Sequence, residues 1–178
     1  MSMKKATGFT LVELMVAIAI LALLTTIAVP SFNQMIASNR LTTQTNGLIA
    51  AMNIARSEAI KLNRTVSLCR IAGPNDDECA GNGTWTNWAV LHEDRVILRG
   101  AIDSFNGTLV ATSDTGNNAL TDASLEFSPD GLVRTGGNIA TNRQIRLCST
   151  ALNSSNVRRI SIGPGSRIST EKETGSCA

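Results

Sequence analysis

Few residues in this sequence have the types and spacing that carry chemistry. His92 is the only histidine, and Glu93 and Asp94 follow it directly. Neighbouring residues of a strand point to opposite faces, so these three side chains do not form a nucleophilic triad. The glycine clusters at residues 136–137 and 163–165 lack the Lys-Ser/Thr ending of a phosphate-binding loop. The sequence therefore predicts no catalytic residue, no enzyme activity and no cofactor.

One carboxylate, that of Glu13, interrupts a long apolar segment. Phe9 to Val29 is almost continuously apolar over 21 residues, and a helix of that length crosses the hydrocarbon core of a bilayer. A carboxylate inside a membrane helix costs about 2.5–3.5 kcal/mol and usually marks a function or a partner. The segment contains no lysine or arginine. The amine of a neighbouring copy is therefore the expected partner of Glu13, the alternative being a side chain that reaches the membrane surface.

A short polar leader containing Lys4 and Lys5 precedes this segment. An ordinary secretory signal places its cleavage site after the apolar region. Here Gly8 stands before the apolar region. This order predicts that the leader is removed while the helix stays, so that the mature chain begins at Phe9 with a free amine.

The run Gly8-Phe9-Thr10-Leu11-Val12-Glu13 resembles the class III signal of type IV pilins and type II secretion pseudopilins. The resemblance implies cleavage between Gly8 and Phe9 by a prepilin peptidase, N-methylation of Phe9, and assembly of the helix into a filament core. It also implies that Glu13 neutralises the N-terminal amine of a neighbouring subunit. Pro30 falls where many pilin helices bend, and a proline inside a helix predicts a kink or a melted turn.

Beyond Pro30 the pattern becomes periodic. Side chains that would face a core recur at alternating spacings of four and three, which marks one face of a helix. These residues are Leu41, Thr45, Leu48, Met52, Ala55, Ala59 and Leu62. We therefore predict one helix from about Phe9 to Asn63. The predicted domains are a leader (1–8), a transmembrane half-helix (9–29), an amphipathic half-helix (30–64) and a β-rich head (65–178).

From Thr65 onward, short β-rich runs alternate with turn formers, which indicates strands. The predicted strands are Thr65–Arg70, Trp88–His92, Val96–Arg99, Leu109–Thr112, Leu125–Phe127, Leu132–Arg134, Arg143–Cys148, Val157–Ile162 and Arg167–Thr170. The clearest hairpin joins Leu125–Phe127 to Leu132–Arg134 through Ser128-Pro129-Asp130-Gly131. The sequence predicts an α+β fold, in which a long N-terminal helix packs on a mostly antiparallel β-sheet head.

Four cysteines offer covalent support to the head of a chain with only 3% aromatic residues. A head beyond the cytoplasm permits disulfides, and four cysteines allow three pairings. We favour Cys69–Cys79 with Cys148–Cys177, because the second bridge would tie down the C-terminus. A zinc site is not expected, because the spacings lack a Cys-x-x-Cys pair and His92 is the only histidine.

Charge is unevenly distributed although the net charge is only +2. Residues 1–70 carry seven basic and two acidic side chains, residues 71–130 two and ten, and residues 131–178 seven and two. Crossing strands could interleave these segments into a mixed, solvated surface. Alternatively, the head has a negative and a positive side that dock against other heads.

The head resembles the GspH/FimT/FimU domain. The resemblance rests on Ala55-Arg56-Ser57-Glu58-Ala59-Ile60-Lys61, Val66-Ser67-Leu68-Cys69, Trp88-Ala89-Val90, Phe127-Ser128-Pro129-Asp130-Gly131, Ile145-Arg146-Leu147-Cys148 and Arg159-Ile160-Ser161-Ile162. It implies a minor pilin in the tip or priming complex that initiates a type IV pilus, with a type II secretion minor pseudopilin as an alternative. The implied partners are other minor pilins, the major pilin, the prepilin peptidase, the inner-membrane assembly platform and the lipid bilayer. The implied location is the bacterial inner membrane, with the head in the periplasm, and then the cell-surface pilus.

DNA binding is a second function class. FimT-like relatives bind DNA through a Gly-Arg-x-Arg pattern, of which Gly165-Ser166-Arg167-Ile168-Ser169 keeps one arginine. The candidate contacts for phosphate or for a protein partner are Arg143, Arg146, Arg158, Arg159 and Arg167. Glu171 and Glu173 oppose such a patch, and no aromatic residue after Phe127 is available to stack on bases. The sequence therefore favours docking of this region on other pilin heads.

Overall fold

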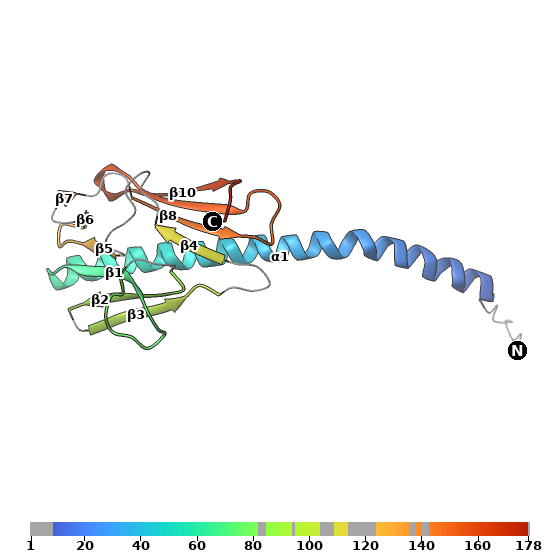
Figure 1. Ribbon diagram of the computed structural model, residues 1–178, viewed down its shortest axis with the longest axis horizontal. Helices are drawn as coiled ribbons and strands as arrows, with labels where there is room; N and C mark the ends of the chain where they lie inside the picture. The colour runs from blue at the N-terminus through green and yellow to red at the C-terminus, as the bar shows by residue number, and fades with distance from the viewer. Residues whose placement is uncertain are drawn as a thin grey trace, which may run out of the picture. The chain divides into compact units, whose positions relative to one another are not determined.

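The computed structural model describes residues 9–81, 85–93, 95–103, 109–113, 124–135, 138–139 and 143–177. The chain forms two compact units, Met1–Ile36 and Ala37–Ala178. The first unit contributes the apolar start of the helix. The second, called the head below, contains the rest of the helix and all described strands (Figure 1).

The helix α1 runs from Leu11 to Leu62 and contains Pro30. The helix continues through Pro30 without a break. Of the two alternatives expected at Pro30, a kink or a melted turn, the melted turn is therefore wrong. A proline removes one N–H donor from the ladder, while the turns on either side keep their bonds. The hydroxyl groups of Thr26 and Ser31 also donate to the carbonyls of Leu23 and Ile27, which satisfies polar side chains within the helix.

Six antiparallel strands form sheet A, in the order β3-β2-β1-β5-β6-β7. The strands are β1 (Val66–Ile71), β2 (Asn87–His92), β3 (Arg95–Ala101), β5 (Ser124–Phe127), β6 (Val133–Thr135) and β7 (Asn138–Ile139). The predicted β5–β6 hairpin is present, and Gly131 N–H donates to Ser128 O at 2.8 Å in its turn. Gly131 has a φ of 75°, a left-handed conformation that glycine adopts at little cost.

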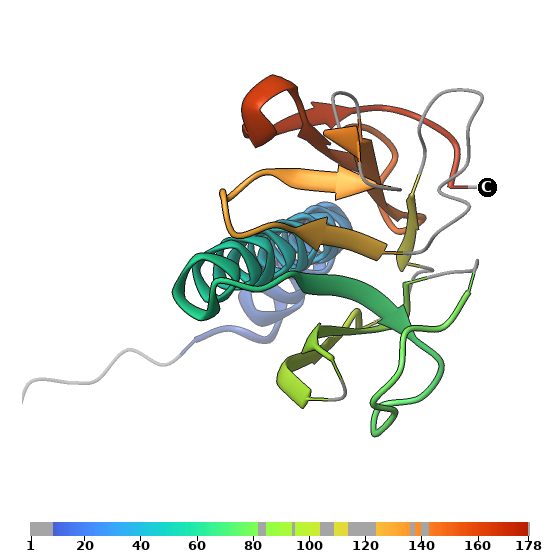
Figure 2. The same ribbon diagram turned by 90° about the vertical axis from the view of Figure 1, so that its left-hand side faces the viewer.

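Sheet B has four antiparallel strands in the order β10-β9-β8-β4. They are β4 (Leu109–Ser113), β8 (Arg143–Ser149), β9 (Val157–Ile162) and β10 (Ile168–Glu173), and the short 3-10 turn η1 (Pro164–Ser166) joins β9 to β10. Figure 2 shows β8 to β10 in orange and red above the helix and β1 to β3 in green below it.

The core of the head lies where α1 meets the two sheets. Leu41, Leu48 and Met52 of α1 are fully or almost fully buried. They belong to one cluster with Leu68, Leu125 and Phe127 of sheet A and Ile145, Leu147, Ile160 and Ile162 of sheet B. The predicted helical face is thus the buried face, except that Leu62 is exposed. The predicted α+β fold is confirmed.

Candidate functional site

The N-terminal site consists of Phe9, Thr10 and Glu13. Thr10 precedes the first helical residue, and its Oγ1 accepts a hydrogen bond from the Glu13 N–H at 3.2 Å. This is the N-cap contact of a Thr-x-x-Glu capping box, which satisfies one of the free N–H groups at the helix start. Sequence reasoning missed the role of Thr10, although the Thr-x-x-Glu spacing is visible in the sequence. Gly8, the predicted cleavage residue, lies outside the described residues.

The apolar half of α1 exposes its side chains. Phe9, Leu11 and the large apolar residues that follow, up to Met35, are all more than half exposed within the chain. The helix is long and apolar enough to cross a membrane. Among the described residues, Glu13 has no ion-pair partner. A carboxylate in apolar surroundings without a cation is suited to pairing with a charge supplied by another molecule.

Two disulfides stabilise the head, and they join the pairs that the sequence analysis favoured. Cys69–Cys79 closes the loop between β1 and β2, with Cα atoms 5.6 Å apart. Cys148–Cys177 joins β8 to the end of the chain, with Cα atoms 5.4 Å apart. The first bridge thus constrains an acidic loop that contains Asp76, Asp77 and Glu78.

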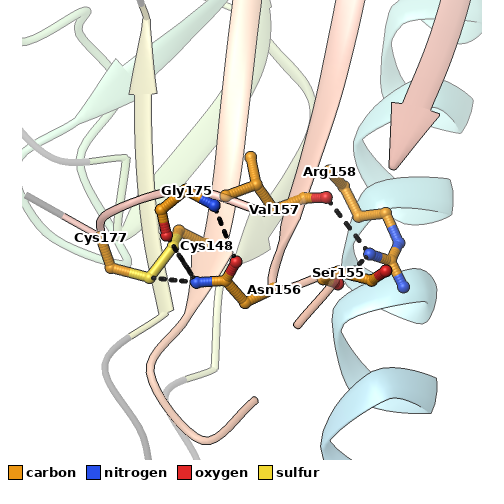
Figure 3. Close-up of a disulfide and its surroundings, with 7 residues drawn as sticks. All are labelled: Cys148, Ser155, Asn156, Val157, Arg158, Gly175 and Cys177. Atoms are coloured by element: carbon orange, nitrogen blue, oxygen red, sulfur yellow. Dashed lines mark hydrogen bonds between the residues drawn. A yellow bond between two sulfur atoms is a disulfide. The ribbon is translucent and has the colours of Figure 1, made fainter. Parts of the chain in front are cut away.

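Asn156 reinforces the C-terminal bridge (Figure 3). Its Nδ2 donates to Gly175 O at 2.7 Å, and its Oδ1 accepts from Gly175 N–H at 3.0 Å. The same Nδ2 lies 3.7 Å from Cys148 Sγ and 3.6 Å from Cys177 Sγ. One buried amide therefore fixes the C-terminal segment by two backbone hydrogen bonds beside the disulfide.

Arg146 and Arg159 share the outer face of sheet B. They are paired in register on β8 and β9, a position in which like charges destabilise a sheet. Glu173 of β10 offsets this repulsion, because its carboxylate lies 2.6 Å from Arg159 Nη2, and Glu171 lies 3.9 Å from Arg159 Nη1. This part of the predicted basic patch is neutralised by its own strand neighbour.

Arg158 points to the inner side of sheet B and is only 4% exposed. Its Nη1 donates to Ser155 O at 2.6 Å, and its Nη2 donates to Ser38 Oγ of α1 at 3.4 Å. Burial lowers the pKa of Arg158 from its ordinary value, because desolvation disfavours the charged form. Arg158 therefore joins sheet B to the helix and is not available to a phosphate.

The remaining two arginines of the predicted patch lie at the η1 end of sheet B. Arg143 pairs in register with Ile162 and is half-buried. Arg167 follows η1 and is exposed. The structure thus does not gather the five arginines on one surface, because neighbouring residues of a strand face opposite sides of the sheet.

A contact centre at Ser166 was not found by sequence reasoning. Ser166 is fully buried with a φ of 58°. Its Oγ accepts from Val133 N–H of sheet A at 2.6 Å, and its carbonyl accepts from Arg56 Nη2 of α1. The Arg56 guanidinium also lies 5.9 Å from the centroid of the Phe127 ring, a distance compatible with a cation–π contact. The helix, sheet A and the β9–β10 corner meet here.

A groove opens beside this contact centre. It has a volume of about 440 Å³ and lies between Ile49, Asn53 and Arg56 of α1 and residues 167–170 of the β10 segment. Of the described residues, two arginines and no carboxylate line it. An arrangement of this kind is suited to an acidic partner rather than to catalysis.

No assembled catalytic or metal site is found among the residues that the structure describes. His92 Nδ1 lies 3.0 Å from Thr65 O, so its ring contacts the backbone beyond the helix. Glu93 occupies the turn into β3 with a φ of 52°, and Asp94 lies outside the described residues. In the same part of the chain, no group of three or more His, Cys, Asp or Glu residues could hold a metal ion.

A capped apolar N-terminal helix, continued as the core helix of an antiparallel β head, defines a pilin-like protein. Residues 3–29 match the prokaryotic N-terminal methylation motif. Residues 44–166 match the family described as Type II transport protein GspH. The chain belongs to this GspH family. No curated protein matches it by sequence comparison.

Two crystal structures of the type IV minor pilin FimU of Pseudomonas aeruginosa strain PAO1 have a similar fold. The first is 21% identical with a TM-score of 0.56, and the matched region covers 79% of this chain and 97% of the FimU chain. The second is 19% identical with a TM-score of 0.55, and the matched region covers 77% of this chain and 99% of the FimU chain. At this identity the likeness concerns the fold.

Proposed function

We propose that this chain is a minor pilin of a type IV pilus and belongs to the tip or priming complex that starts pilus assembly. The observation that carries the proposal is the Glu13 carboxylate at the capped start of an apolar helix, within a methylation motif. It has no ion-pair partner in the part of the chain that the structure describes. Such a carboxylate is costly in a lipid-embedded monomer. Pairing with the N-terminal amine of a neighbouring subunit would remove that cost.

In this proposal, the leader 1–8 is removed between Gly8 and Phe9, and Phe9 is N-methylated by the prepilin peptidase. The segment 9–29 holds the chain in the inner membrane with the head in the periplasm. The chain then joins other minor pilins and the major pilin at the assembly platform. Likeness of the head to FimU, which is named as a type IV minor pilin, supports a pilus over a secretion pseudopilus.

Processing is tested by Gly8→Glu, with Ser2→Glu as a matched control that adds the same charge to the leader away from the cleavage site. We expect Gly8→Glu to accumulate as an unprocessed membrane precursor, whereas the control is cleaved. Mass spectrometry of the N-terminus measures both. A native chain that begins at Met1 in assembled filaments would contradict the proposal.

The tip or priming role is tested by deleting the gene and counting pili. A priming subunit controls how many filaments start, so we expect fewer pili per cell with unchanged pilus length. Complementation by the wild-type chain should restore the number. Normal pilus number together with loss of a type II secreted substrate would assign the chain to a secretion pseudopilus instead.

DNA binding remains the second candidate, and the exposure of Arg167 after Gly165 favours it. Neutralisation of Arg159 by Glu173 and burial of Arg158 weaken it. Arg167→Glu in the full chain, compared with Lys172→Glu, tests it by retention of labelled DNA at physiological salt. DNA binding that only Arg167→Glu abolishes, without a change in piliation, would support uptake.

A further inference from the structure

The groove between α1 and β10 borders a free sheet edge. β10 is the last strand of sheet B and pairs only with β9 among the described strands. Gly163 N–H, at the end of β9, donates to Arg167 O at 2.9 Å. The backbone groups of Arg167 therefore point toward β9. Backbone direction alternates along an antiparallel strand. The N–H and C=O groups of Ile168 and Thr170 therefore point away from β9.

Charged residues occupy only one half of this edge. Glu171, Lys172 and Glu173 occupy the C-terminal half of β10, and charged residues on an edge discourage pairing with another strand. Ile168, Ser169 and Thr170 form the uncharged half, and all three line the groove. The part of the β10 edge without charged residues, 168–170, is thus the part that lies beside the groove.

The groove is cationic and partly apolar. Arg167 is exposed and has no acidic partner among the described residues. Arg56 Nε is buried without a hydrogen-bond partner there, although Nη2 donates to Ser166 O. Ile49 and Ile168 contribute apolar surface. A segment that fills this groove should offer backbone hydrogen bonds, a carboxylate for the arginines, and aliphatic side chains.

We propose that an extended acidic segment of a neighbouring pilin head docks in this groove by adding a strand to the free edge of β10. Main-chain hydrogen bonds with Ile168 and Thr170 would give the affinity, and a carboxylate at Arg167 and Arg56 would give the specificity. This inference rests on the proposed pilin function. It names the surface of the head that contacts its neighbour.

The binding test uses the full processed chain in detergent micelles and a fluorescein-labelled peptide that alternates glutamate with valine. The same peptide with glutamine in place of glutamate is the control for charge. We expect fluorescence polarisation to show at least tenfold tighter binding of the glutamate peptide, since each tenfold corresponds to about 1.4 kcal/mol. Equal binding of the two peptides, or no binding of either, would overturn the proposal.

Two variants locate the peptide on the groove. Arg167→Glu should weaken binding at least tenfold, whereas Lys172→Glu, on the same strand but outside the groove, should change it less than twofold. Thr170→Pro removes an outward N–H without breaking the β9 ladder, so it should also weaken binding with little loss of thermal stability. Binding that neither Arg167→Glu nor Thr170→Pro changes would overturn the proposal, as would preference of the groove for single-stranded DNA over the peptide.

The same variants in cells separate this inference from the pilin function itself. If the wild-type chain enters sheared pili whereas Arg167→Glu and Thr170→Pro enter poorly, the pilin function and the docking groove are both supported. If all three enter equally, the docking groove is wrong and the pilin function stands. If wild-type chain never enters pili, the proposed function fails, and peptide binding in micelles then decides whether the groove binds acidic segments in another setting.

Discussion

Val133 of sheet A donates its backbone N–H to Ser166 Oγ at the corner of sheet B, at 2.6 Å. The same serine accepts a hydrogen bond from Arg56 of the helix through its carbonyl. Ser166 is fully buried, so water does not replace either bond. One residue therefore connects the three elements that form the head, through its side chain to sheet A and through its carbonyl to the helix.

Ser166→Ala should destabilise the head by about 1–3 kcal/mol, because it leaves the buried Val133 N–H without an acceptor. Unfolding of the full chain by urea, followed by tryptophan fluorescence, measures the change. Ser169→Ala is the control, since Ser169 is exposed on β10. Equal stability of the two variants would show that the Val133 bond contributes nothing.

Local patterns in the sequence were sufficient to predict the helix and the strands. The predicted helix from Phe9 to Asn63 is observed from Leu11 to Leu62, and each of the nine predicted strands overlaps an observed one. The two-residue β7 was missed, because so short a strand has no periodicity to read. Period-2 and period-3.6 patterns are local, so they can be recognised in the sequence without knowledge of the tertiary structure.

The docking surface could not be predicted in the same way. Alternation places Arg158 and Arg159 on opposite faces, but which face is buried depends on the register between strands and on the helix that covers them. The neutralisation of Arg159 by Glu173 likewise depends on the β9–β10 pairing. Ser166 contacts residues that are distant in the sequence, and a lone serine in a turn carries no signal of such a role.

Removing the Cys148–Cys177 disulfide should release the C-terminal segment. The double variant Cys148→Ser/Cys177→Ser should lose about 2–4 kcal/mol of stability, and residues 174–177 should become sensitive to carboxypeptidase. Cys69→Ser/Cys79→Ser is the matched control. It opens a loop with a separation of 10 residues rather than 29, so it should cost less and leave the C-terminus protected. Protection of the C-terminus without its disulfide would assign that role to Asn156 alone.

Asp130 should make the stability of the β5–β6 hairpin depend on pH. The hydrogen bond from Arg134, at 2.6 Å, lowers the pKa of Asp130 below its ordinary value, with a further contribution from the Leu132 N–H. A lowered pKa in the folded state means that the stabilisation is fully present above about pH 4 and is lost as the pH falls through the folded value. The urea midpoint of the wild type should therefore approach that of Asp130→Asn at low pH and exceed it near pH 6. A difference independent of pH would contradict this role.

Glu13 should act through its charge in the filament and not mainly through the helix cap. Loss of a cap costs about 0.5–2 kcal/mol, whereas an ammonium left unpaired in an apolar filament core costs about 3–5 kcal/mol. Glu13→Gln, which keeps the size of the side chain but removes the charge, should therefore insert into the membrane normally but enter pili poorly. Thr10→Ala, which removes the cap acceptor and keeps the carboxylate, should enter pili at near wild-type abundance. Immunoblots of sheared pili, normalised to the membrane fraction, measure both variants. Normal incorporation of Glu13→Gln together with poor incorporation of Thr10→Ala would contradict the role of the charge and show that pilus entry depends on the Thr10 cap.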